Sequence, residues 1–242
     1  MKKLLLSAAI LMAAAGAATA ADLPYRAPLA PFVPAAANWS GCYVGGHVGG
    51  GWAWHDHTNT ANTTAFGDFI PGQGFANPGS GYVGGGHVGC NYQAGRLVFG
   101  IEGSYSTADI KGDYASVAGA ADDVFTHRIS DIATVVGRFG MAYDQWLYYT
   151  KLGWAGARAT LSVVDTTGVS TGAGSDTHWH NGVTIGSGIE YGFTRNWIAG
   201  FETNYFRFEK KSYEVGDATG LYTFSARPRD VYTAVGRLSY KF

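Results

Sequence analysis

Eight short segments in which apolar side chains alternate with small or polar ones limit the folds open to this chain more than any other feature. A period of two residues is that of a β-strand whose two faces meet different surroundings. In the last segment, Leu238, Tyr240 and Phe242 fall on one face, whereas Arg237 and Ser239 fall on the other. The segments are 39–54, 82–93, 97–105, 134–143, 146–154, 183–193, 197–205 and 231–242.

The composition indicates where these apolar faces can be buried. Charged residues make up 14% of the chain, and ordinary soluble domains have about 25%. The 17 Lys and Arg residues are balanced by 18 Asp and Glu residues, which gives no basic surface and excludes nucleic acid as a partner. After the N-terminal run, no stretch reaches the ~18 consecutive apolar residues that a membrane helix needs. The apolar surface must therefore lie on strands.

The N-terminus has the pattern of a secretory signal. Lys2 and Lys3 precede an apolar run, and Ala18-Thr19-Ala20 forms a small-residue cleavage site. We expect residues 1–20 to be a signal peptide, 21–37 to be an Ala- and Pro-rich periplasmic tether, and 38–242 to be one β-domain.

The connections between the segments alternate in length. Short turns lie at 94–96, 144–145 and 194–196, and long polar loops are expected at about 55–81, 107–130, 162–178 and 209–229. A β-sandwich has no reason to sort its loops in this way, whereas an outer-membrane barrel does. The sequence therefore predicts an all-β fold, an eight-stranded antiparallel up-and-down transmembrane β-barrel. Closure would pair the last strand with the first and leave no edge.

Aromatic residues sort to the strand ends on the apolar face, as two girdles at the membrane interfaces would require. One girdle would lie at the long-loop ends and consist of Trp52, Trp54, Tyr82, Tyr105, Trp154 and Tyr205. The other would lie at the short-turn ends and consist of Tyr92, Tyr143, Trp146, Tyr191, Phe193, Trp197, Tyr240 and Phe242.

The inward positions carry charges at a common depth, counted from the short-turn ends. We expect them to form a belt across the lumen, with His47 and His87 at a similar depth: Glu102, Arg138, Lys151, Glu190, Glu202 and Arg237. An eight-stranded barrel is just wide enough to be filled by side chains, so a hydrogen-bonded plug is expected. The alternative is a set of hydrated charges that line a pore.

The two cysteines, Cys42 and Cys90, face each other if Val44 pairs with Val88. Opposed residues in adjacent strands are close enough for a disulfide, and the compartment is oxidising. Two free thiols are the alternative.

Other polar clusters carry weaker signals. The triplets 55–57 and 178–180 contain paired histidines, but a metal site needs three or four converging ligands. His127, Ser130 and Asp131 are residue types found in hydrolase active sites. Parity, however, places His127 and Ser130 on opposite faces of a strand, where they cannot hydrogen-bond directly. We therefore expect neither a cofactor nor an enzymatic activity.

Several stretches resemble the small outer-membrane β-barrel proteins of alphaproteobacteria, the outer-membrane immunogenic or porin-family proteins. They are AADLP, NWSGCYVGGHVGGGW, LVFGIEG, VVGRFGMAYDQWLYYTKLGWA, GIEYGFTRNW and GRLSYKF, in this order over 20–242. The ending Leu238, Tyr240 and Phe242 also resembles the signal that the outer-membrane assembly machinery reads.

The resemblance implies a non-catalytic structural protein of the outer membrane, whose partners would be membrane lipid, lipopolysaccharide and the assembly machinery. The alternatives are a narrow porin and a surface protein that binds haemin or host ligands. We also expect Arg207, a charge on the lipid face, to extend outward to the interface, towards lipopolysaccharide phosphates.

Overall fold

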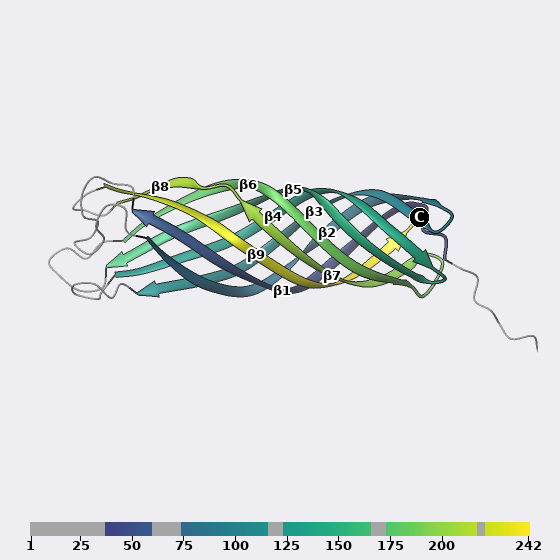
Figure 1. Ribbon diagram of the computed structural model, residues 1–242. Coiled ribbons are helices and arrows are strands. Elements are labelled where there is room, and N and C mark those ends of the chain that lie inside the picture. Colours follow the sequence, from purple (N-terminus) through teal and green to yellow (C-terminus); the bar gives the residue numbers. More distant parts are fainter. Residues whose placement is uncertain (1–36, 60–73, 116–122, 166–172, 217–220) are drawn as a thin grey trace, which may run out of the picture. The chain divides into compact units, whose positions relative to one another are not determined.

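The computed structural model describes residues 37–59, 74–115, 123–165, 173–216 and 221–242 (Figure 1). Every regular element in this part of the chain is a strand. The described residues contain no helix that is long and apolar enough to cross a membrane. The strands are β1 (Gly41–Asn59), β2 (Gly74–Ala94), β3 (Leu97–Ala115), β4 (Asp123–Tyr143), β5 (Trp146–Asp165), β6 (Ala173–Gly192), β7 (Trp197–Phe208), β8 (Lys211–Gly216) and β9 (Leu221–Lys241).

The strands form a closed antiparallel ring. Each of β1 to β6 pairs with the next, β7 pairs with β9, and β9 pairs with β1. β8 pairs with β9 in the register of β7, since Phe206 opposes Val231 and Lys211 opposes Ala226. β7 and β8 therefore form one interrupted strand of the wall, and the predicted eight-stranded ring is confirmed.

The strands are longer than we predicted at one end of the barrel. The bounds of the loops expected at 55–81, 107–130, 162–178 and 209–229 were wrong, because the strands continue into each of these segments from both sides. The remaining residues of these connections, 60–73, 116–122, 166–172 and 217–220, lie outside the described part of the chain. We call this end of the barrel the distal end, and the other the short-turn end.

The reason for this error is that the amphipathic pattern reverses its sense along the strands. Near the middle of the barrel, apolar side chains point outward, and Val48, Ile101 and Leu152 are 60% to 69% exposed. On β5 beyond Trp154, the buried inward positions become apolar (Ala155, Ala157, Ala159, Leu161 and Val163), whereas Arg158 points outward. A strand that passes from lipid into water needs this change, because only its inner face then remains dry.

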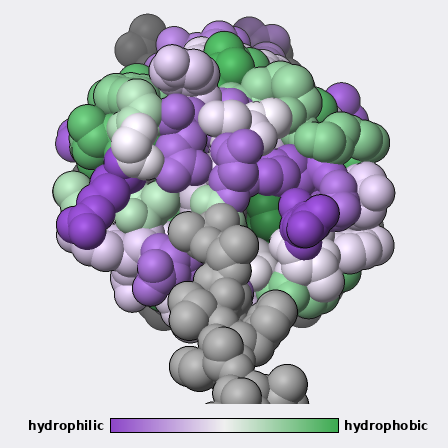
Figure 2. Space-filling view, turned by 90° about the vertical axis from the view of Figure 1, so that its right-hand side faces the viewer, coloured by the Kyte–Doolittle hydropathy of each residue, from purple (hydrophilic) through white to green (hydrophobic). Residues whose placement is uncertain are grey.

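The short-turn end is closed by the residues just before β1. Trp39 is 1% exposed and packs inside the barrel with Val98, Leu147 and Ile198. Its backbone N–H donates to Gln93 Oε1 at 2.7 Å, which fixes this segment to β2. Figure 2 shows the short-turn end, where hydrophilic residues gather over the centre and hydrophobic ones lie towards the rim.

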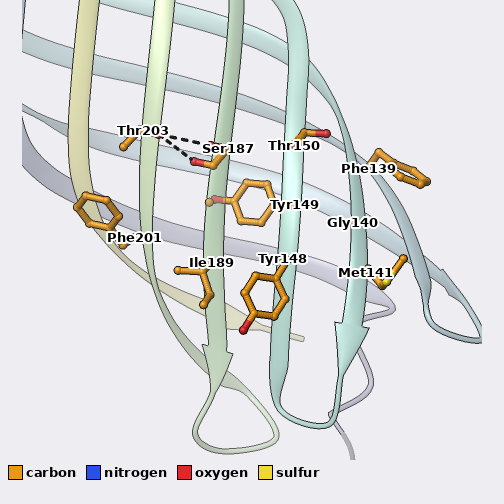
Figure 3. A pocket seen from close by; sticks show the side chains of 11 residues that line it. Phe139, Gly140, Met141, Tyr148, Tyr149, Thr150, Ser187, Ile189, Phe201 and Thr203 are labelled. Atoms are coloured by element: carbon orange, nitrogen blue, oxygen red, sulfur yellow. Dashed lines mark hydrogen bonds between the residues drawn. The ribbon is translucent and has the colours of Figure 1, made fainter.

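Near the middle of the barrel the outer wall is mostly apolar. A shallow hollow over β4 to β7 is lined by Phe139, Met141, Tyr148, Ile189 and Phe201, and the small hydroxyl side chains lie at its end away from the short turns (Figure 3). The hollow lies outside the ring and is separate from the interior of the barrel.

Candidate functional site: a charged belt inside the barrel

Six ionisable side chains from six strands meet inside the barrel, and they are the six charged residues placed there by parity. Their side chains are at most 4% exposed. They are Glu102 of β3, Arg138 of β4, Lys151 of β5, Glu190 of β6, Glu202 of β7 and Arg237 of β9. The set has three carboxylates and three cations, so the belt is neutral as a whole.

Arg237 links two of the carboxylates. Its Nη2 lies 2.5 Å from Glu102 Oε2, and its Nη1 contacts Glu202 Oε2. Lys151 connects the same two carboxylates from β5, with its Nζ 2.6 Å from Glu202 Oε1 and 3.5 Å from Glu102 Oε1. Each of these carboxylates therefore has more than one cationic neighbour, which compensates for its loss of water.

Arg138 completes the belt on the other side of Glu102. Its Nη1 lies 3.2 Å from Glu102 Oε2, and its Nη2 lies 2.9 Å from Glu190 Oε1. The guanidinium also lies 4.0 Å from the centre of the Tyr149 ring. A cation over a desolvated aromatic face adds to the attraction of the carboxylates.

Two tyrosines that the sequence analysis did not include belong to this network. Tyr43 donates to Glu102 Oε2 at 2.8 Å, and Tyr149 donates to Glu202 Oε2 at 2.6 Å. Both residues have inward parity, and each lies beside a glycine of the next strand, Gly89 or Gly188. A large inward side chain beside a cross-strand glycine is a signal that could have identified them.

The two histidines lie beside the belt and form a hydrogen-bonded chain of their own. His47 Nδ1 lies 3.3 Å from His87 Nδ1, and the rings are stacked. His47 Nε2 lies 2.8 Å from Ser106 Oγ, and His87 Nε2 lies 2.8 Å from Ser239 Oγ. This chain fills the part of the lumen between β1, β2, β3 and β9.

Apolar layers lie on both sides of the belt. The layer towards the short-turn end contains Trp39, Val98, Ala142, Leu147 and Ile198. The layer towards the distal end contains twelve buried residues of the described chain, among them Ile110, Ile129, Phe206 and Phe208. Between the belt and this second layer is a space of about 30 Å³, room for little more than one or two waters.

The predicted girdle residues lie on the outer surface. Tyr191 and Tyr205 are partly exposed, and the rest are exposed: Trp52, Trp54, Tyr82, Tyr92, Tyr105, Tyr143, Trp146, Trp154, Phe193, Trp197, Tyr240 and Phe242. Arg207 is exposed one residue before the end of β7, at the level of the distal girdle, since Val183 of β6 opposes both Trp154 and Arg207. At the C-terminus, Leu238, Tyr240 and Phe242 point outward, and the Phe242 N–H donates to the Cys42 carbonyl at 3.0 Å.

A disulfide joins Cys42 and Cys90. β1 and β2 pair in the register that opposes Val44 to Val88 and Cys42 to Cys90. The bridge lies on the outer wall near the short-turn end. It joins β2 to β1, the strand that closes the barrel by pairing with β9.

The remaining polar candidates lie at the distal end. His178 Nε2 lies 3.0 Å from Asp176 Oδ2, and His180 lies between Tyr213 and the Glu209 carbonyl. His127 is buried in the lumen, whereas Ser130 lies at a bulge and donates to Asp131 at 2.8 Å. The side chains of 55–57 lie outside the described residues.

Comparison with known proteins places this architecture in a family. The family model of the outer membrane protein beta-barrel domain matches residues 5–241. The 25 kDa outer-membrane immunogenic protein of Brucella canis is 25% identical over 224 residues, which are 90% of each chain. The 22 kDa outer membrane protein of Rhizobium leguminosarum bv. viciae is 27% identical over 186 residues, 77% of this chain and 72% of that protein.

Among solved structures, the outer membrane protease OmpT of Escherichia coli has a TM-score of 0.50 at 8% identity, covering 84% of this chain and 97% of OmpT. A likeness at this identity concerns the fold alone. The two relatives come from the bacterial group that the sequence motifs indicated, which confirms the predicted resemblance. The chain belongs to the outer membrane protein beta-barrel family and is an outer-membrane protein of Gram-negative bacteria.

Proposed function

We propose that this protein is a structural component of the outer membrane that supports envelope integrity through a sealed barrel, without catalysis. The observation that carries the proposal is the belt of Glu102, Arg138, Lys151, Glu190, Glu202 and Arg237, enclosed between two apolar layers. Paired charges packed between dry layers leave ions and solutes no hydrated path.

Mutual pairing of the charges supports a role in stability over a role in transport. A pore that conducts ions needs side chains that exchange contacts with water and with the passing ion. Here the single side chain of Glu102 has four contacts, with Tyr43, Arg138, Lys151 and Arg237. Moving one member of the belt would therefore break several contacts at once.

The proposal can be tested in the bacterium that makes the protein. A strain that lacks the gene should lose periplasmic proteins to the medium and become sensitive to bile-salt detergent. The intact gene should restore both properties, and uptake of small sugars should be unchanged in all strains. A deletion strain with an intact permeability barrier and slower sugar uptake would reject the structural role in favour of a porin.

A further inference from the structure

Three cationic side chains lie together on the outer wall, beyond the distal girdle. Lys111 of β3 opposes Arg128 of β4, and Arg158 of β5 lies on the next strand. Their side chains are 49%, 48% and 54% exposed, respectively. We call these three residues the cation platform.

Two carboxylates hold the cation platform from beneath. Asp109 lies 3.1 Å from Lys111 Nζ and 2.7 Å from Arg128 Nε. Asp131 lies 3.5 Å from Arg158 Nη1. The two acidic side chains are only 22% and 13% exposed, so the cations form the outermost layer and an approaching ligand meets positive charge first.

The neighbouring polar groups define the limits of the platform. Asp131 also accepts hydrogen bonds from Tyr105 and Ser130, which satisfies its oxygens from the girdle side. On the far side, the exposed Asp113 accepts a bond from Thr126 at 2.8 Å. A ligand must therefore bind between these two carboxylates.

The depth of the cation platform matches the headgroup layer of the outer leaflet. Arg158 is four residues beyond the girdle residue Trp154 on β5, and girdle aromatics mark the membrane interface. At the distal girdle, the described wall of β9, β1 and β2 carries the aromatic residues Trp54, Tyr82 and Tyr232 instead. The cation platform thus lies just beyond the distal girdle, at the depth expected of lipid phosphates.

We propose that Lys111, Arg128 and Arg158 bind the phosphate groups of lipopolysaccharide. Guanidinium groups donate paired hydrogen bonds to phosphate, and a lysine adds a mobile point charge. Lipopolysaccharide is the source because its acyl chains lie against the apolar wall below the platform, which holds its phosphates at this depth. The proposal does not depend on whether the lumen is sealed.

The binding of lipopolysaccharide to the full-length protein in detergent can be measured by native mass spectrometry. Intact lipopolysaccharide and the same material after removal of its phosphates are compared on the unmutated protein. We expect the phosphorylated form to bind about tenfold more tightly, as expected when a charge-assisted contact is added. Equal binding of the two forms would overturn the proposal without any mutation.

The variant Lys111→Gln/Arg128→Gln/Arg158→Gln should lose this preference. The matched control is Arg96→Gln, which removes an exposed arginine at the short-turn end and should keep it. Heat-dependent migration on a gel verifies that each variant is folded. A folded triple variant that keeps the tenfold preference would reject the cation platform as the site.

Inorganic phosphate identifies the source of the ligand. We expect competing inorganic phosphate to displace lipopolysaccharide only at concentrations more than about tenfold above the lipid phosphate, since the free ion lacks the apolar contacts. Displacement at equal phosphate concentration would contradict a lipid site.

Discussion

Tyr149 occupies the space that a side chain at residue 188 would need. A Cβ atom at Gly188 would lie 2.5 Å from the Tyr149 hydroxyl oxygen, and Tyr43 stands in the same relation to Gly89. The absence of two side chains thus lets two large inward rings lie flat across neighbouring strands. Their hydroxyls then reach Glu202 and Glu102, where they stabilise buried carboxylates.

Gly188→Ala should therefore lower the free energy of unfolding by ~1–3 kcal/mol, because the methyl group displaces Tyr149 from Glu202. Urea titration of the protein in lipid vesicles measures this. The control is Gly137→Ala on the outer wall, where the nearest atom to an added Cβ is 3.9 Å away. Equal effects of the two substitutions would show that the Tyr149 contact is not the cause.

Removing one member of the belt should cost more. Arg138→Ala or Glu202→Ala removes one of the partners of the buried opposite charges, for which we expect a loss of ~3–5 kcal/mol in the free energy of unfolding. The same titration applies, with Arg207→Ala on the exposed outer wall as the control. Losses below ~1 kcal/mol for both belt variants would mean that the belt is hydrated rather than packed.

At the level of elements, β8 is attached to the wall differently from the other strands. It pairs with β9 by backbone bonds, but side chains connect it to β6: His180 contacts Tyr213 at 2.6 Å, and Asp176 accepts from the Glu214 N–H at 2.9 Å. His180 Nδ1 lies 2.9 Å from the Glu209 carbonyl, which can only accept. Nδ1 therefore carries the proton, and Nε2 accepts the Tyr213 hydroxyl.

The attachment of β8 should weaken in acid. Burial lowers the pKa of His180 below its usual 6.5, so the folded state favours the neutral ring. The contribution to stability is complete above pH 6.5 and decreases as the pH falls below it, because the unfolded state then binds more protons. The pKa of Asp176 is also lowered: although burial opposes this, the bonds from the Glu214 and Thr177 N–H groups and the contact with His178 together outweigh it, and the carboxylate stays charged in this pH range.

Amide hydrogen exchange of 211–216 at pH 7.5 and pH 5, corrected for the intrinsic rate, measures this effect. We expect faster corrected exchange at pH 5 in the unmutated protein and no pH difference in His180→Gln. His127, Lys211 and Glu209 also lie near this cluster, so His178→Gln is made as the neighbouring control. A pH effect that persists in His180→Gln and disappears in His178→Gln would contradict the prediction, because the effect would then arise from His178.

Elements also show what could be predicted from the sequence. Alternation identified the girdle-to-girdle part of each of the eight wall strands, but not β8, which lies in an expected loop. It also identified the inward positions of Glu102 and Arg237, because parity alone decides which way a side chain points. The distal strand ends were missed because we took an apolar outward face as the mark of a strand. On β5 that face ends at Trp154, although Ala157, Leu161 and Val163 continue the alternation with the opposite sense.

The contacts inside the belt could not be predicted in the same way. Counting residues from the short-turn ends gave the depth of each charge, but the choice of partner depends on the stagger of strands around the ring. Glu102 and Arg237 are 135 residues apart and contact each other across the lumen. Bulges between Ile129 and Asp131 and between Trp54 and His55 change the register further out.

For the whole molecule, the interior changes character along the barrel axis. Trp39 and its neighbours close the short-turn end, the charged belt follows, and an apolar layer with Ile129 and Phe208 lies beyond it. The paired charges inside and the apolar surface outside stabilise the barrel in the membrane by the same principle, since each carboxylate of the belt has a cationic partner where water is scarce.

Planar-bilayer conductance of the purified unmutated monomer tests the sealed interior most directly. The account predicts no steady conductance above that of the protein-free bilayer, and a measurable conductance for Arg138→Ala or Glu202→Ala, in which the belt is incomplete. Steady, high conductance from the unmutated monomer would contradict it, because ions would then cross a lumen that the belt and the two apolar layers should close.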